Sequence, residues 1–161
     1  MQTQVMFYLL NDDKAKDEST DIKSSTDTIN TSSALYHACL QASFFYRQNQ
    51  RVFIYTQDQQ SAEQIDELLW AFDSDSFVPH NLAGEGPKQG ATVEISHQAP
   101  RGRRPVLINL TGTVPNFANQ FQFIVDFVPS NEVLKQQARE RFKTCRQWGF
   151  QVDNQAVAEP K

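Results

Sequence analysis

The sequence predicts an α/β protein, a three-layer sandwich built on a mainly parallel sheet. Short runs of apolar, β-favouring residues alternate with longer segments that carry apolar residues at helical spacing. Two of the later runs, 106–110 and 121–128, are almost continuously apolar, which is typical of strands buried on both faces. The 161 residues suffice for a single domain, residues 1–161, whose core needs neither disulfide nor metal.

The chain begins with a buried strand at residues 5–10, followed by a long polar segment at residues 11–33. This segment is rich in Asp, Ser, Thr and Lys, so burial of apolar groups cannot offset the entropy lost on ordering. We therefore predict a polar, mobile insertion. Thr31, Ser32 or Ser33 can cap the helix that follows it. That helix places on one face Leu35, Ala38, Cys39, Ala42, Phe45 and Tyr46.

A second strand at residues 52–55 leads into a helix that begins with a capping box of Ser61 and Gln64. The inward stripe of this helix consists of Ile65, Leu68, Leu69 and Phe72. Trp70 lies roughly 100° away from most of that stripe, so its indole faces outward. An apolar stretch follows closely: Phe77, Val78, Pro79 and Leu82. Such a cluster is often a contact surface, but a long loop folded back over its own tryptophan would give the same pattern.

Three further strands complete the predicted sheet, at residues 92–95, 106–110 and 121–128. The basic connection PRGRRP at residues 100–105 is interpreted as a solvated turn. Pro129 ends the last of these strands, and Asn131 can cap the final helix. The C-terminal tail, residues 151–161, is expected to add a short edge strand before it frays.

The final helix, residues 132–148, has two distinct faces. Its mostly apolar face, which we expect to meet the core, carries Leu134, Ala138, Arg141, Cys145 and Trp148. A neighbouring sector carries what we call the basic row: Lys135, Arg139, Lys143 and Arg146. Phe142 lies on the boundary between the two. Because the whole chain has a net charge of -4, this row should attract an acidic partner that the rest of the surface repels.

The sequence lacks the motifs of common catalytic and metal sites. Cys39 and Cys145 lie in helical patterns without a CxxC motif and are interpreted as buried free thiols. The three histidines are too far apart in the sequence to suggest a metal site. His80 is interpreted as bonding backbone within its own loop, rather than forming an acid-base pair with Glu85. No GxSxG or Cys/His signature is present, so we predict no catalytic residue, no metal and no cofactor.

A nucleotide site is also disfavoured, because the sequence has no nucleotide-binding fingerprint. The first predicted strand is followed by Asn11, Asp12 and Asp13, which place carboxylates where a pyrophosphate needs backbone donors and glycines. The glycine-rich stretch at residues 84–90 lacks the Lys-Ser/Thr pair of a phosphate loop and is interpreted as a surface turn.

The basic row leaves three interpretations open. Four charges could follow a nucleic-acid backbone, but there is no row of aromatic residues for bases to stack on. An acidic peptide fits better, because Arg139 can grip a carboxylate with two hydrogen bonds while Phe142 forms the floor of an apolar pocket. An ordinary solvated helix face, in which Glu132 partly offsets the charge, remains the third interpretation.

Five stretches of the chain match a known family in order and spacing: IDELLWAF, SFVPHNLAGEGP, VEI, VDFVP and LKQQARERFK. They resemble the chi subunits of bacterial DNA polymerase III holoenzyme, over nearly the whole chain. The resemblance implies a Rossmann-like fold without a catalytic centre. The chain departs from the family in the polar segment 11–33, which is longer, and in the C-terminal tail.

The resemblance also implies two protein partners. Chi-like proteins bind the acidic C-terminal tail of single-stranded DNA-binding protein, which ends in Pro-Phe. They also bind the psi subunit, which connects them to the clamp loader. The tail site would consist of Lys135, Arg139, Phe142 and Lys143, flanked by Arg146; at Phe142 a tyrosine is more usual, so a hydroxyl is missing here. The psi site, which a helicase is thought to share, would consist of Trp70, Phe77, Val78, Pro79 and Leu82.

The function expected on this basis is that of a non-catalytic adaptor in DNA replication, which reaches DNA only indirectly. Two alternatives remain: a small nucleotide-dependent enzyme on the same fold, and a direct binder of single-stranded DNA. The N-terminal apolar run is too short to span a bilayer or to act as a signal peptide. We therefore expect no membrane association, and a cytoplasmic protein held at the nucleoid through the replisome.

Overall fold

The computed structural model describes residues 3–10, 32–72, 79–82, 92–100 and 104–156. The strands are β1 (Gln4–Leu9), β2 (Val52–Thr56), β3 (His80–Leu82), β4 (Val93–Ser96), β5 (Val106–Leu110), β6 (Phe123–Val128) and β7 (Gln151–Ala156). The helices are α1 (Ser32–Arg47), α2 (Gln59–Phe72) and α3 (Glu132–Gln147), with a short 3-10 helix η2 (Ala118–Gln120). The strands form one sheet in the order β3-β4-β2-β5-β6-β1-β7, and all of these strand pairs are parallel.

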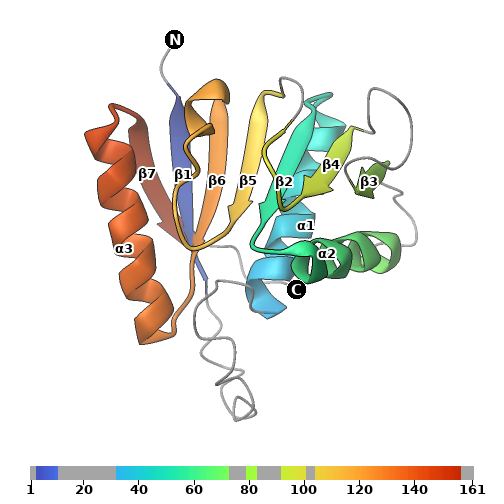
Figure 1. Ribbon diagram of the computed structural model, residues 1–161, viewed down its shortest axis with the longest axis horizontal. Helices are drawn as coiled ribbons and strands as arrows, with labels where there is room; N and C mark the ends of the chain where they lie inside the picture. Colours follow the sequence, from blue (N-terminus) through green and yellow to red (C-terminus); the bar gives the residue numbers. More distant parts are fainter. Residues whose placement is uncertain (1–2, 11–31, 73–78, 83–91, 101–103, 157–161) are drawn as a thin grey trace.

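The predicted three-layer α/β sandwich is confirmed (Figure 1). Helices α1 and α2 pack on one face of the sheet, where Ala38 and Ile65 join strand residues such as Ile54 and Ile108 in one apolar cluster. Helix α3 covers the other face, together with the segment around η2. Since side chains alternate along a strand, successive residues of the buried strands supply the two cores. Ile108 of β5 belongs to the first core, whereas Leu107 belongs to the second.

The ends of the sheet differ in what lies beside them. Strand β3 is one edge, next to β4, and α2 lies near it. Strand β7 is the opposite edge, pairs with β1 from Gln4↔Gln151 to Leu9↔Ala156, and lies beside α3. The expected edge strand in the C-terminal tail is therefore confirmed. Figure 1 shows α3 and α2 at opposite ends of the sheet.

Most predicted elements are present with shifts of one or two residues at their ends. Strand β3 was not predicted, because its three residues carry no strand pattern. The capping box of Ser61 and Gln64 is wrong: α2 begins at Gln59, and the side chain of Asp58 accepts the Ser61 N–H at 2.9 Å. This bond lowers the pKa of the Asp58 carboxyl.

Two side chains assigned to inward stripes are exposed instead. Leu68 is on the solvent side of α2, while Ile65 and Leu69 are buried as predicted. Trp148 is 46% exposed, because α3 ends at Gln147 and Trp148 is already its C-cap. Its ring contacts the ring of Phe150 edge-on. The other residues of the predicted apolar face, Leu134, Ala138, Arg141 and Cys145, are buried.

Several predictions concern parts of the chain outside the described residues. They include the mobile insertion, of which only Ser32 and Ser33 are described as the start of α1, and the glycine-rich turn at residues 84–90. The side chains that were expected to cap α1, and the side chain of Phe72, also lie outside them. These points stay predictions.

Candidate functional site

Helix α3 is bounded at both ends by residues that stop a helix. Asn131 caps the N-terminus as predicted, and its side chain accepts the Leu134 N–H at 3.0 Å. At the other end Gly149 has a φ of 84°, a left-handed conformation that favours glycine. Its N–H donates to the carbonyl of Arg146 at 3.1 Å. The caps fix where the helix begins and ends, and its buried stripe of Leu134, Ala138, Arg141 and Cys145 sets the rotation of the helix, and so which face meets the sheet.

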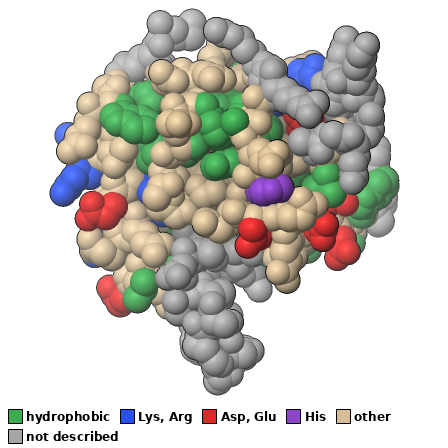
Figure 2. Space-filling view, viewed as in Figure 1, with side chains coloured by type: hydrophobic (Ala, Val, Ile, Leu, Met, Phe, Trp, Pro, Cys, Tyr) green, Lys and Arg blue, Asp and Glu red, His purple; other side chains and the backbone are tan. Residues whose placement is uncertain are grey.

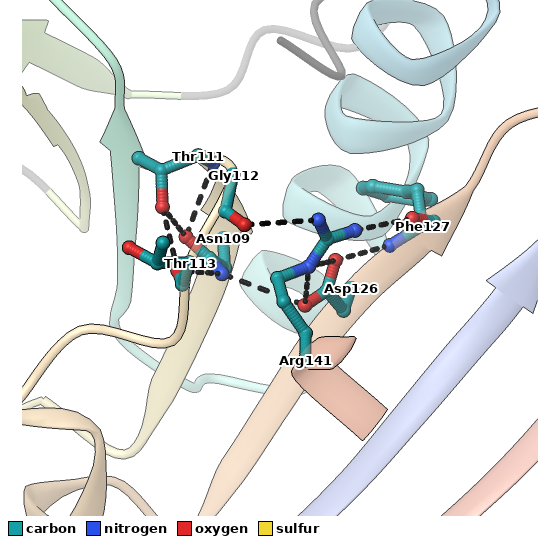
Figure 3. Close-up of polar contacts among 7 residues, drawn as sticks. All are labelled: Asn109, Thr111, Gly112, Thr113, Asp126, Phe127 and Arg141. Carbon is teal, nitrogen blue, oxygen red and sulfur yellow. Dashed lines mark hydrogen bonds and ion pairs between the residues drawn. The ribbon is translucent and has the colours of Figure 1, made fainter. Parts of the chain in front are cut away.

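Two arginines of α3, Arg139 and Arg141, illustrate this rotation, because a step of two residues turns the side chain by roughly 200°. Arg139 is exposed, whereas Arg141 is only 1% exposed. The Nε of Arg141 donates to both carboxylate oxygens of Asp126 on β6, at 3.2 and 3.0 Å. Its Nη2 donates to the carbonyl of Phe127 at 3.0 Å (Figure 3). The prediction that Arg141 faces the core is confirmed.

The buried Asp126 is held by further hydrogen bonds. Its Oδ1 accepts the Phe127 N–H at 2.8 Å, and its Oδ2 accepts from Nδ2 of Asn109 at 3.4 Å. Burial raises the pKa of the Asp126 carboxyl, and the Arg141 guanidinium opposes that rise. Asn109 in turn accepts the hydroxyl of Thr111 at 2.7 Å. This network, drawn in Figure 3, ties α3 to the ends of β5 and β6.

The basic row lies on the far side of α3 from this network. Lys135 is half-buried, with its Nζ 3.8 Å from the carboxylate of Glu132. Arg139 donates to the side-chain oxygen of Gln136 at 3.1 Å. Among the described residues, Arg139, Lys143 and Arg146 form no ion pair. Their positive charge is therefore available to a partner. Figure 2 shows Lys and Arg side chains at the left edge, where α3 lies in the same view.

A hollow of about 450 Å³ opens between α3 and the carboxyl ends of β1 and β6; we call it the α3 hollow. Phe142 lines it and packs on Phe7 of β1, with ring centroids 5.2 Å apart. Lys135 and Arg139 supply its cationic groups. The rest of the lining is Leu9, Leu10, Val128, Pro129, Ser130, Ala138 and Asn154. The hollow thus combines an apolar floor with two cations, and none of the described residues that line it is acidic.

A second, shallower hollow of about 390 Å³ continues along the helix. It shares Arg139 and Phe142 with the α3 hollow and adds Lys143, Arg146 and Gln147. All five residues assigned to the tail site are therefore neighbours along two adjoining hollows. The prediction of Phe142 at the boundary of two faces is confirmed, because its ring is half-buried between them.

Sequence reasoning missed the residues of this site that come from outside α3. Phe7 and Leu9 belong to the first strand, and Asn154 belongs to the last. They meet only because β1 and β7 are neighbours in the sheet, with Phe7 opposite Asn154. One signal was present in the sequence: the carboxyl ends of parallel strands meet at one edge, where α/β proteins commonly bind ligands.

The other predicted surface surrounds Trp70 near the end of α2. Its side chain is 62% exposed, which confirms the predicted outward-facing indole; the loop of the alternative interpretation lies outside the described residues. The indole lies edge-on against the His80 ring, with centroids 5.0 Å apart. His80 is buried, and its Nε2 lies 3.2 Å from the backbone carbonyl of Asp66 on α2 and 3.5 Å from the Asp66 carboxylate. His80 thus bonds to the backbone of α2, whereas the predicted bond within its own loop stays a prediction, because residues 73–78 and 83–91 lie outside the described residues.

The structure places the remaining residues of this surface in different surroundings. Pro79 is half-buried, and Leu82 is half-buried against the apolar core of α1 and α2. Leu82 thus contributes to the core, and its place in the psi site stays a prediction. Phe77 and Val78 lie outside the described residues. Of the predicted psi site, only Trp70 is an exposed large apolar side chain among the described residues.

Other charged and reactive groups turn out to be structural. The predicted solvated turn at residues 100–105 is wrong for Arg104, which is buried and donates to the carbonyl of Thr92 at 2.9 Å. The Glu94 carboxylate lies 3.4 Å from its guanidinium. Cys39 and Cys145 are buried free thiols, as predicted. Burial raises the pKa of each thiol to about 12, so neither is a ready nucleophile at neutral pH.

In the described parts of the chain, no helix has both the length and the apolar character needed to cross a membrane. The same residues contain no group of three or more His, Cys, Asp or Glu side chains placed to hold a metal ion.

The family model and three relatives found by sequence agree on one family. The family model described as "DNA polymerase III chi subunit, HolC" matches residues 2–153. A DNA polymerase III subunit chi of Escherichia coli is 48% identical over 110 residues, covering 67% of this chain and 75% of that protein. The one of Haemophilus influenzae is 41% identical over 122 residues, covering 74% and 85%. The one of Pseudomonas aeruginosa is 29% identical over 123 residues, covering 76% and 86%.

Among solved structures, the crystal structure of T4 UvsW aligns with 97% of this chain at a TM-score of 0.62. The sequence identity is 10%, and the aligned part is 41% of that chain. This likeness concerns the fold alone.

Proposed function

Because the chain belongs to the family of the DNA polymerase III chi subunit, we propose that it is a non-catalytic adaptor between proteins of the replication machinery. On one side it binds the acidic C-terminal tail of single-stranded DNA-binding protein. On the other side it binds the psi subunit, and through psi the clamp loader. It is thereby held at the nucleoid with the replisome, and it reaches DNA only through its partners.

The α3 hollow is the observation that supports binding of the acidic tail. A peptide that ends in Pro-Phe presents an apolar ring and a terminal carboxylate at one point. The hollow offers Phe142 and Phe7 for the ring and Arg139 and Lys135 for the carboxylate. Acidic residues further up the tail can then reach Lys143 and Arg146 in the neighbouring hollow. Because none of the described residues that line the two hollows is acidic, this lining does not repel an acidic ligand.

The surface around Trp70 supports the proposal for psi. A tryptophan with most of its side chain in contact with water is a strong candidate for an interface anchor. The contact of Trp70 with the buried His80 ring limits the orientations of the indole. A helicase that uses the same residues would compete with psi.

The experiment is a calorimetric titration with an acidic peptide that ends in Pro-Phe and has a free carboxylate. Arg139→Ala should lose about 1.5–3 kcal/mol, or roughly 10- to 150-fold in affinity, because a charge-assisted hydrogen bond is removed. Arg47→Ala is the matched control, since it removes the same charge from the end of α1, on the opposite face of the sheet. Equal affinities of the two variants would refute the tail site.

Binding of three ligands, the peptide, an oligonucleotide and a nucleotide, separates the proposal from its two alternatives. A direct binder of single-stranded DNA should bind a fluorescent oligonucleotide in the absence of any partner protein. A nucleotide-dependent enzyme should bind a nucleotide and ignore the peptide. The adaptor binds the peptide and neither of the other two ligands.

A further inference from the structure

Strand β7 forms an edge of the described sheet beside the α3 hollow. Strand β7 is the last strand in the sheet order and pairs only with β1 among the described residues. The N–H of Gln151 donates to the carbonyl of Thr3 at 2.9 Å. Because successive backbone groups alternate in direction, Gln151, Asp153 and Gln155 bond toward β1. The backbone groups of Val152, Asn154 and Ala156 therefore point away from the sheet.

Those outward groups lie next to the tail site. Asn154 lines the α3 hollow and is opposite Phe7 in the register. A side chain on the next residue, Asp153, points to the other face of the sheet, because neighbours on a strand alternate. The only acidic residue of β7 is thus turned away from the face that carries α3 and the basic row.

The direction of a bound tail follows from the order of the two hollows. The α3 hollow contains Lys135, near the N-terminus of α3, and the second hollow contains Arg146 and Gln147 at its C-terminus. Since α3 connects the parallel strands β6 and β7, it runs antiparallel to them. A peptide whose last residue fills the α3 hollow and whose earlier residues reach Arg146 therefore runs in the same direction as β7.

We propose that an acidic peptide bound at the α3 hollow extends the sheet, with the residues before its C-terminal anchor pairing with β7 as an added parallel strand. This proposal rests on the proposed function of the hollow as a tail site. Charge complementarity with the basic row selects the occupant, and the outward backbone groups of β7 supply hydrogen bonds that any sequence can use. In the paired form alternate side chains of the peptide face α3, so every second acidic residue meets the basic row.

The test compares a ten-residue acidic peptide that ends in Pro-Phe with the dipeptide Pro-Phe, each binding to two variants at one position. Asn154→Pro removes an outward N–H, which an edge strand tolerates because that group has no ladder partner. Asn154→Ala removes the same side chain and keeps the N–H. The ratio of long-peptide affinity to dipeptide affinity should be about 2- to 10-fold smaller for Asn154→Pro than for Asn154→Ala, as expected for one lost hydrogen bond.

Amide hydrogen exchange on the unaltered chain is the second measurement. The long peptide should slow exchange at Val152, Asn154 and Ala156, and the dipeptide should not. Equal affinity ratios in the two variants, together with unchanged exchange at these amides, would overturn strand addition while leaving the anchor site intact. Failure of the long peptide and the dipeptide to bind the unaltered chain would overturn the tail site itself, and strand addition with it.

Discussion

The two edges of the sheet offer opposite chemistry to a partner. At the β7 edge an apolar hollow lies beneath exposed cations of α3, and its lining, in the part of the chain that the structure describes, contains no acidic residue. At the β3 edge the indole of Trp70 stands on α2, a helix that carries Glu63, Asp66 and Glu67 and no basic residue. The first edge fits a flexible acidic peptide, whereas the second fits a folded apolar surface. An adaptor needs this kind of separation, because its partners must not compete.

The two edges also differ in how their helices are fixed. Helix α3 is anchored through its middle by the buried pair of Arg141 and Asp126. Helix α2 is held by Ile65 and Leu69 in the core and by the Asp58 cap at its start. Damage to one anchor should therefore affect one edge more than the other.

The largest expected effect is on stability, through the buried pair. Asp126→Ala leaves the Arg141 guanidinium buried without its counter-ion and should lower the free energy of unfolding by about 3–5 kcal/mol. Urea denaturation measures this. Asp153→Ala removes an exposed carboxylate from β7 and is the matched control, with an expected change within about 0.5 kcal/mol. A loss below about 1 kcal/mol for Asp126→Ala would mean that α3 is held mainly by its apolar contacts.

The next effect is on the β3 edge alone. Trp70→Ala should weaken psi binding by about 2 kcal/mol or more, because it removes a tryptophan that the complex with psi would bury. Tail-peptide affinity should stay the same, since Trp70 and α3 lie at opposite ends of the sheet. Trp148→Ala, which removes another exposed indole, is the control. Co-purification with psi at low concentration decides the point, and an intact complex would place the psi surface elsewhere.

The Asp58 cap should have a smaller effect. Asp58→Ala should lower stability by about 1 kcal/mol, because the Ser61 N–H loses its acceptor. The pKa of this carboxyl is lowered from 3.8 in the folded chain. Its contribution is therefore present above pH 3.8 and is lost as the pH falls through the lower folded pKa. The thermal unfolding temperatures of the unaltered chain and of Asp58→Ala should converge in strong acid. An undiminished difference there would contradict the role of the charge.

The smallest expected effect is that of salt on partner binding at the two edges. Raising the ionic strength should weaken tail binding by roughly 0.5–1 kcal/mol, because exposed charge pairs are screened over about 10 Å or less. Psi binding at the β3 edge should change less. Titrations of both partners over one salt series test this, and an equal response at the two edges would contradict the contrast in charge.

Much of this comparison could be predicted from the sequence, because helical periodicity separates the faces of α3 without knowledge of the fold. The basic row, Phe142 and the burial of Arg141 all follow from spacing. Spacing does not identify the partner of Arg141. A single acidic residue within an apolar strand, here Asp126, is nevertheless a signal that a buried cation lies nearby. Strand β3, with three residues, is too short to carry a pattern. Its absence from the prediction also hid the contact of His80 with α2.

The α3 hollow shows a different limit. Its lining joins residues from β1, α3 and β7, and their proximity depends on a strand order that spacing along the chain does not determine. The same holds for Arg104, which looks like a solvated charge in PRGRRP but reaches the carbonyl of Thr92 beside β4. Local sequence predicts which face a residue occupies, and sheet topology decides what that face meets.

The adaptor account is tested most directly by titrating the tail peptide in the presence and absence of saturating psi. Because the two surfaces lie at opposite edges of the sheet, the account predicts the same Kd within about twofold and one peptide bound per ternary complex. A Kd that rises in proportion to the psi concentration would show that the two partners compete for one surface, and would contradict the account.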